Sequence, residues 1–244
     1  AKLFDGKKYF DYPKPVSLIE RCLQLYSDKD SLILDFFSGS ATTAHAVMQL
    51  NAEDGGNRKF IMVQLPELTD EKSEAYKAGY KNICEIGKER IRRAGAKIKA
   101  DSPLTTQHLD TGFRVLKLDS SNMKDVFYSP KETSQLELFR YVDNVKDDRT
   151  SEDLLFQVML ELGATLDSKI EESEVDGKTI YNVADGYLVA CFDQEVSDEV
   201  VTAIAKMQPT YAVLRDTSLA NDATATNFEQ IFKTYAPNTT TKIL

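Results

Sequence analysis

The chain has few of the residues on which metal and disulfide sites depend. Its 244 residues include three cysteines, far apart and without a CxxC pair, and two histidines, His45 and His108, with no cysteine cluster beside them. This spacing argues against a zinc site. The cysteines, Cys22, Cys84 and Cys191, each sit beside apolar residues. We therefore expect reduced, buried thiols in a cytoplasmic protein.

Basic residues and long apolar runs are also scarce. The chain carries 30 Lys and Arg against 39 Asp and Glu, a formal net charge of −9. Proteins that bind duplex DNA unaided are usually basic, because phosphate contacts supply most of the affinity. The charge therefore argues against DNA binding by this chain alone. No apolar run is long enough to cross a bilayer, and charges interrupt residues 1–10, unlike a signal peptide.

Glycine is scarce where a bound phosphate would need it. Residues 35–43 (DFFSGSATT) contain only Gly39, and no Gly-Lys-Ser/Thr occurs anywhere, which disfavours NAD and excludes a P-loop. The segment places an acid at a strand end, then a small-residue turn, then a helix start. A ligand with a carboxylate and an ammonium fits this pattern, the helix N-terminus holding the carboxylate and Asp35 attracting the cation. The alternative is a tight turn that binds no ligand.

The first half of the chain alternates strand-like and helix-like segments. Residues 31–37 (SLILDFF) are typical of a strand buried on both faces. A helix is predicted at residues 40–50, with Ser40 as its N-cap. The other predicted elements are a strand at 59–65, a helix at 82–94 ended by Gly95, and a strand at 113–118. This order predicts a parallel sheet with covering helices, the α/β class.

A second, smaller α/β unit is predicted after a charged linker at residues 146–149. Thr150 and Asp153 form a capping box at the start of a helix that Gly163 ends. Asp-Gly turns at 176–177 and 185–186 predict a small β-meander over residues 169–192. Further elements are expected as a helix at 198–206, a strand at 211–214, a helix at 227–235 and a strand at 241–244. The predicted domains are residues 1–125 and 150–244.

Two motifs resemble those of amino-methyltransferases. Residues 35–47 (DFFSGSATTAHAV) resemble the S-adenosylmethionine motif Phe-x-Gly-x-Gly, with Ala41 in place of the second glycine. That replacement is mild if Ala41 has helical dihedrals, since only a left-handed conformation would demand glycine. Residues 12–16 (YPKPV) resemble the Lys-Pro motif that directly precedes the cofactor motif in the β order of these enzymes.

One branch of this family is particularly similar. Residues 63–67 (VQLPE), 75–95 (AYKAGYKNICEIGKERIRRAG) and 112–122 (GFRVLKLDSSN) resemble the modification subunit of type III restriction–modification systems, as does the tail from Leu214 through Asn227 to Phe232. Most relatives bind the ribose hydroxyls with an acid where Gln64 stands. Gln64 can still form a hydrogen bond, though as a neutral and weaker partner, and Glu67 is the other candidate.

The resemblance implies a partial S-adenosylmethionine-dependent methyltransferase sheet, Rossmann-like, followed by the smaller α/β domain. It assigns cofactor binding to Tyr12, Lys14, Pro15, Asp35, Phe36, Phe37, Ser38, Gly39, Ser40, Thr42, Gln64 and Leu65. Family members methylate adenine N6 with an Asp-Pro-Pro-Tyr loop that holds a flipped base. The seven prolines here include no Pro-Pro pair. We therefore expect no catalytic residue in this chain, and a target-recognition region and catalytic loop N-terminal to it.

The implied partners are DNA, contacted through that N-terminal part, a second modification subunit and the restriction subunit, with no membrane. An alternative from another class is an interaction module, in which residues 150–244 dock a partner subunit. Arg90, Arg92 and Arg93 are interpreted as a solvated helix face, not as a DNA-binding patch.

Overall fold

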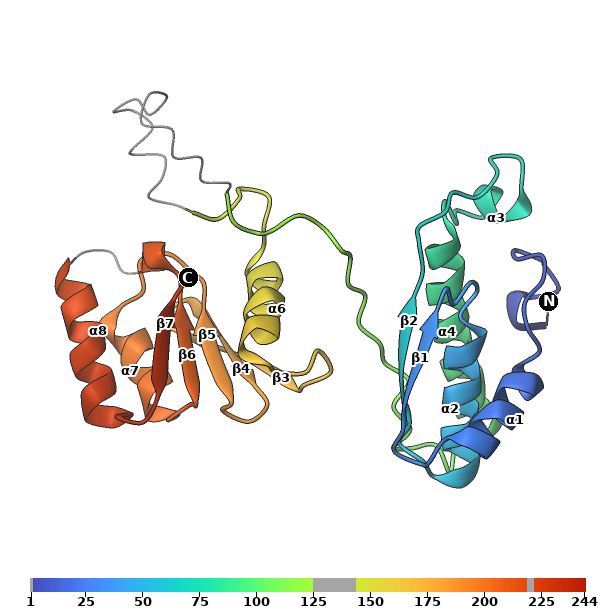
Figure 1. Cartoon of the computed structure of the whole chain (residues 1–244), viewed down its shortest axis with the longest axis horizontal. Coiled ribbons are helices and arrows are strands. Elements are labelled where there is room, and N and C mark those ends of the chain that lie inside the picture. Colours follow the sequence, from blue (N-terminus) through green and yellow to red (C-terminus); the bar gives the residue numbers. More distant parts are fainter. Residues whose placement is uncertain (1, 125–143, 219–221) are drawn as a thin grey trace. The chain divides into compact units, whose positions relative to one another are not determined.

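The computed structural model describes residues 2–124, 144–218 and 222–244, which form two compact units, Ala1–Val115 and Leu116–Leu244 (Figure 1). The boundary falls before the predicted end of the first domain at residue 125. The reason is that Met123 packs against the core of unit 2 and forms a β-bridge with Val145. Among the described residues, no helix is long and apolar enough to span a membrane.

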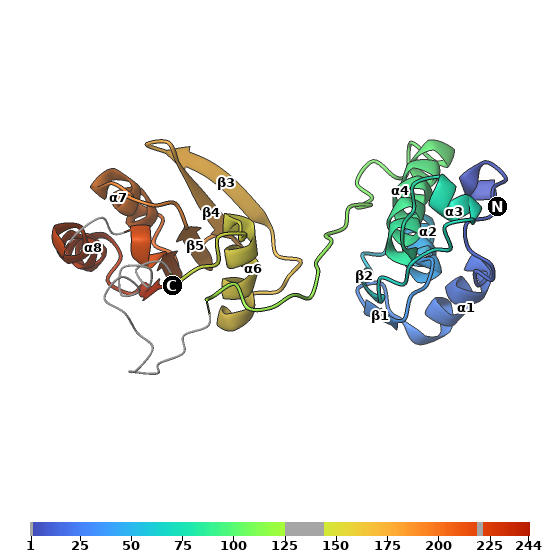
Figure 2. The ribbon, with the colours of Figure 1, turned by 90° about the horizontal axis from the view of Figure 1, so that it is seen from above.

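Unit 1 is built on two parallel strands, β1 (Leu32–Phe36) and β2 (Lys59–Val63), joined by helix α2 (Thr42–Asp54). Helices α1 (Val16–Tyr26) and α4 (Ile83–Asp101) pack beside α2, all on one side of the strands (Figures 1 and 2). The short helices η1 (Lys2–Phe4) and α3 (Glu74–Lys77) complete the unit. The predicted strand–helix–strand–helix order is confirmed.

The two strands are covered on one face only, contrary to the expectation of burial on both. Ile33, Phe60 and Met62 pack against the helices. Side chains alternate along a strand, so every second residue of β1 and β2 points to the opposite face. The apolar residues on that face are exposed: Leu32, Leu34, Phe36, Ile61 and Val63. We call these five side chains the open sheet face.

Helix α4 is longer than predicted, and the strand predicted after it does not form. The helix passes through Gly95 to Asp101. Thr111 packs closely against Gly95, since a Cβ on this glycine would lie 2.8 Å from that of Thr111. Residues 113–118 pair with no strand of the described chain. Phe113 packs on the core of unit 1, whereas Leu118 is fully exposed.

Unit 2 contains a five-stranded sheet of order β3-β4-β5-β6-β7. Strands β3 (Ile170–Val175), β4 (Lys178–Val183) and β5 (Leu188–Cys191) form the predicted antiparallel meander. Strands β6 (Tyr211–Leu214) and β7 (Thr240–Ile243) continue it in parallel, each after a crossover helix. These helices are α7 (Asp198–Lys206) and α8 (Asp222–Tyr235), which begins earlier than predicted; η3 (Asp216–Ser218) lies between them.

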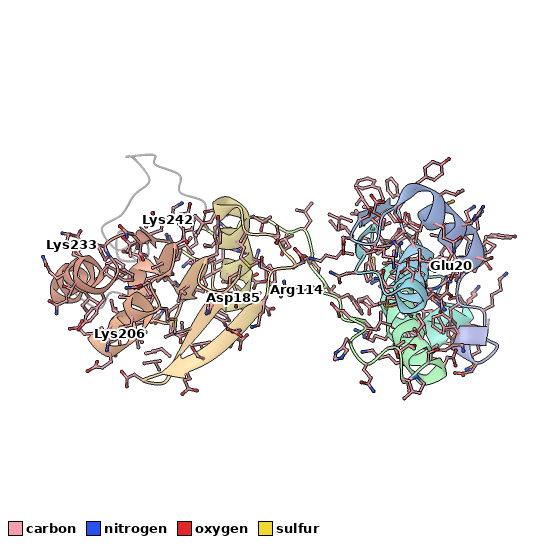
Figure 3. All side chains as sticks on the ribbon, turned by 90° about the horizontal axis from the view of Figure 1, so that it is seen from below. Glu20, Arg114, Asp185, Lys206, Lys233 and Lys242 are labelled. Carbon is pink, nitrogen blue, oxygen red and sulfur yellow. The ribbon has the colours of Figure 1, made fainter. Side chains whose placement is uncertain are left out.

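Both faces of this sheet are covered, as Figure 2 shows. Helices α7 and α8 pack on one face, over Val189, Cys191 and Leu214. Helix α6 (Ser151–Leu162) packs on the other. Figure 3 labels one lysine on each of these helices. Lys206 of α7 lies over the ring of Tyr235. Lys233 of α8 pairs with Glu229.

The segment before α6 is part of unit 2, not the predicted linker. Val145 is only 1% exposed and belongs to the core, and the half-buried Arg149 pairs with Asp119 at 3.4 Å and Asp148 at 3.0 Å. The capping box of Thr150 and Asp153 is confirmed, as is the end of α6 at Gly163.

Candidate functional site

The turn between β1 and α2 has an unusual backbone. Phe37, Gly39 and Ala41 have φ values of +77°, +54° and +57°, while Ser38 and Ser40 between them do not have positive φ. The N–H groups of Phe37, Ser38, Gly39 and Ala41 all donate to acceptors within unit 1, so this backbone forms a compact, internally bonded turn. Ala41 is left-handed, the conformation for which glycine is favoured, and its replacement of glycine is not mild.

Strand β2 holds this turn in place. The N–H groups of Phe37 and Ser38 donate to the carbonyl of Val63 at 2.9 and 3.0 Å. The Gly39 N–H donates to Gln64 Oε1 at 2.7 Å, and Gln64 Nε2 donates to the Leu65 carbonyl at 3.2 Å. The side chain of Gln64 thus supports the turn, while its contact with a ribose stays a prediction.

The start of α2 differs from the prediction by one residue. Ala41, not Ser40, is the N-cap residue, and no side chain caps the helix. The Ser40 hydroxyl instead accepts a hydrogen bond from Arg90 Nη1 at 2.9 Å. The N–H groups of Thr42 and Thr43 lie in the first turn, where a helix supplies no internal acceptor, so they can receive an anionic ligand.

Asp35 lies at the carboxyl end of β1, beside this helix start. It is half-buried, and its Oδ2 accepts a hydrogen bond from Thr43 Oγ1 at 2.5 Å. A carboxylate has further lone pairs, so Asp35 can also accept from a ligand ammonium group. A negative and a positive subsite therefore lie side by side.

A cavity of about 380 Å³ joins these groups to the N-terminal segment. It brings together eight of the predicted site residues: Tyr12, Lys14, Asp35, Phe37, Ser38, Gly39, Ser40 and Thr42. Pro15, Phe36, Gln64 and Leu65 do not line it. The residues that sequence reasoning missed are Phe10, Pro13, Ile19, Leu34 and Thr43. Pro13 and Thr43 lie inside the quoted motifs, so the motifs themselves could have indicated them.

Phe10 is the missed residue with the closest contact to the turn. A Cβ on Gly39 would lie 3.2 Å from Phe10 Cζ, so the ring leaves little room for any other residue at this position. No periodicity or motif around Phe10 indicated this contact. It arises because the chain before α1 folds back over the turn.

Two ionisable side chains lie behind the turn. Arg90 is only 9% exposed, so its interpretation as part of a solvated face was wrong. Arg92 is exposed, and Arg93 pairs with Glu89 at 2.8 Å and Asp5 at 2.9 Å. Burial, together with the positive charges of Arg90 and Lys97, lowers the pKa of His45 to about 4.

The remaining candidates are weaker. No group of three His, Cys, Asp or Glu side chains in the described part of the chain could hold a metal ion. Cys22 is exposed, contrary to prediction, because it lies on the outer side of α1; Cys84 is half-buried and Cys191 buried. An open hollow of about 540 Å³ in unit 2 is lined by Glu171, Glu172, Ser173, Asn182 and Met207. Its two carboxylates would repel an anionic ligand.

Known proteins are similar to this chain over 45–74% of its length. A family model described as DNA methylase matches residues 2–94. The Mod subunit of the type III restriction–modification enzyme StyLTI from Salmonella typhimurium is 50% identical over 109 residues, 45% of this chain and 16% of the relative. The EcoPI Mod subunit from Escherichia phage P1 is 34% identical over 179 residues, 72% of this chain and 26% of the relative. The EcoP15I Mod subunit from Escherichia coli is 34% identical over 186 residues, which are 74% of this chain and 26% of the relative.

The chain thus spans about a quarter or less of the length of these relatives. The two longer matches exceed the extent of unit 1, which ends at Val115, so the similarity reaches into unit 2. The family model spans the Lys-Pro segment and the turn, and the two longer matches include part of unit 2. Residues 2–94 therefore match the DNA methylase family, and the chain is similar to part of the type III restriction–modification Mod subunits.

Proposed function

We propose that the chain forms the S-adenosylmethionine-binding part of a site-specific DNA adenine-N6 methyltransferase of a type III restriction–modification system. The observation that carries this proposal is the cavity that joins Tyr12 and Lys14 of the Lys-Pro segment to Asp35 and the Ser38–Gly39 turn. Two motifs that are separate in sequence share one site.

The chemistry of the cavity suits this cofactor. The amino-acid end of S-adenosylmethionine carries a carboxylate and an ammonium, which match the first-turn N–H groups of α2 and the carboxylate of Asp35. The side chains of Phe10 and Ile19 form an apolar part of the cavity wall. The volume, about 380 Å³, lies in the usual range for small-molecule sites. Gln64 and the exposed Glu67 are the candidates for the ribose hydroxyls.

Methyl transfer needs groups that these 244 residues do not include. The sequence holds no Asp-Pro-Pro-Tyr loop, and its net charge of −9 is unfavourable for contact with phosphates. We therefore expect this chain to bind cofactor without methylating DNA by itself. Catalytic and DNA-reading groups would come from polypeptide outside these residues.

Calorimetric titration with S-adenosylmethionine tests the proposal. We expect the chain to bind S-adenosylmethionine and not NAD. Asp35→Ala should weaken binding about tenfold, equivalent to about 1.4 kcal/mol, because it removes the partner of the ammonium. Asp30→Ala, which removes an exposed acid ahead of β1, should leave affinity unchanged. A folded wild-type chain that binds no S-adenosylmethionine would refute the proposal.

Unit 2 supports a second candidate function, the docking of a partner subunit. The observation in favour is that unit 2 has cores on both faces of its own sheet and shares sequence with the Mod subunits. Residues 116–244 should then bind a modification or restriction subunit as tightly as the whole chain does, and residues 1–115 should not. Equal binding by both pieces, or by neither, would argue against this function.

A further inference from the structure

One buried arginine in unit 1 has no acidic partner in the described part of the chain. Arg90 is 9% exposed, and the one hydrogen bond recorded for its side chain joins Nη1 to Ser40 Oγ at 2.9 Å. Its Nε is buried without a partner among the described residues. Arg58, equally buried, instead pairs with Asp54 at 2.9 Å. Buried charges are nearly always paired, so the unpaired guanidinium of Arg90 requires a reason.

The position of Arg90 supplies one. Helix α4 packs directly on the turn at Gly87, where a Cβ would lie 3.5 Å from both the Gly39 carbonyl oxygen and the Ala41 Cβ. Arg90 follows by about one helical turn on the same side, and its guanidinium reaches Ser40. Ser40 lines the cavity. A positive charge therefore stands immediately behind the cavity wall that also carries the first-turn N–H groups of α2.

A purely structural role explains this arrangement poorly. A neutral side chain could donate to Ser40 without the desolvation that a buried guanidinium suffers. Burial lowers the pKa of Arg90, and its charge in turn lowers the pKa of His45. The charge is therefore felt within α2, whose first turn borders the cavity.

We propose that Arg90 is a positioning residue that makes the cavity select ligands with a carboxylate, acting through Ser40 on the part of the wall formed by the Ser38–Gly39 turn and Thr42. This inference rests on the proposed function and deepens it, because it assigns the amino-acid end of the cofactor to that wall. At the intermediate dielectric of a partly buried site, a charge within several ångströms changes carboxylate affinity by about tenfold or more.

Two ligands that differ only in the carboxylate test the proposal: S-adenosylmethionine and its decarboxylated form. Arg90→Gln removes the charge and keeps a donor for Ser40. We expect this variant to bind S-adenosylmethionine about tenfold more weakly and to bind the decarboxylated form with unchanged affinity. Arg90→Lys should restore most of the preference. Arg92→Gln, in the exposed part of the same helix, is the matched control and should change neither affinity.

The outcomes separate the two proposals. If Arg90→Gln weakens both ligands equally, Arg90 only supports the fold, and the selective role is overturned while cofactor binding stands. If the wild-type chain binds neither ligand, both proposals fail. A readout without ligand is the His45 pKa by NMR, about 4 in the wild type, which should rise in folded Arg90→Gln. An unchanged His45 pKa would also overturn the role.

Discussion

At the residue scale, Ala41 adopts a backbone conformation that L-residues other than glycine avoid. Its φ of +57° and ψ of +43° lie in the left-handed region, directly ahead of α2. This conformation costs a non-glycine residue about 1–2 kcal/mol. Strain of this kind is kept where the surrounding structure fixes the backbone, and it gathers at ligand sites.

We expect Ala41→Gly to stabilise unit 1. Relief of the strain exceeds the extra chain entropy of glycine, leaving a gain of about 0.5–1 kcal/mol. Thermal unfolding should show a rise of roughly 2–6 °C in the Tm of unit 1. Ala96→Gly, the same change at an exposed position inside α4, should instead lower stability by about 1 kcal/mol. A fall in Tm for both variants would show that Ala41 is not strained.

His45 should make stability depend on pH. Its folded pKa of about 4 lies below the ordinary value of 6.5, so the unfolded chain binds more protons between these values. The stabilising contribution is complete above pH 6.5 and is lost as the pH falls toward 4. We expect the Tm difference between wild type and His45→Gln to change over this window. A difference that is constant with pH would mean that His45 titrates normally.

The residues that line the cavity could be predicted only in part. Tyr12, Lys14, Asp35 and the turn line it as expected, because their motifs are contiguous in sequence. Their role in cofactor binding stays a prediction. Arg90 was misread, since a run of arginines on a helix does not show which of them faces inward. The support of the turn by Gln64 depends on the pairing of β1 with β2, which brings residues 39 and 64 together.

At the element scale, the open sheet face is the main departure from a closed fold. Its five apolar side chains come from both strands and form one contiguous surface. A contiguous apolar surface is typical of a protein–protein contact, whereas single exposed leucines are common on surfaces that face solvent.

We expect the chain to self-associate through the open sheet face as its concentration rises. Leu34→Gln together with Ile61→Gln should reduce that association, as measured by sedimentation equilibrium. Leu160→Gln, at a separately exposed leucine of α6, should have no effect. Equal association in all three proteins would assign it to another surface.

Elements fixed by local signals were predicted well, and those fixed by distant contacts were not. The capping box at Thr150 and the meander turns act within a few residues, so sequence alone indicates them. Gly95 was expected to end α4, but Thr111 packs against it and the helix continues. The linker was misplaced because burial of Val145 depends on the core of unit 2.

At the scale of the whole chain, each unit has a hydrophobic core of its own. The helices of unit 1 gather around α2, while the sheet of unit 2 is covered on both faces. Each set of apolar contacts can therefore form and melt by itself. The two longer matches to the Mod subunits exceed the length of either unit, so the similarity includes parts of both.

The segment 113–118, which joins neither sheet of the described chain, has a consequence for proteolysis. A protease needs an extended peptide that can enter its cleft, and this segment offers one with exposed Val115, Leu116 and Leu118. Brief digestion with chymotrypsin should cut here and leave two resistant pieces, identifiable by mass spectrometry. Replacing both leucines with Asp should slow this cut while the pieces stay folded. Cleavage first within α2 or β5 would instead show that the units do not hold together independently.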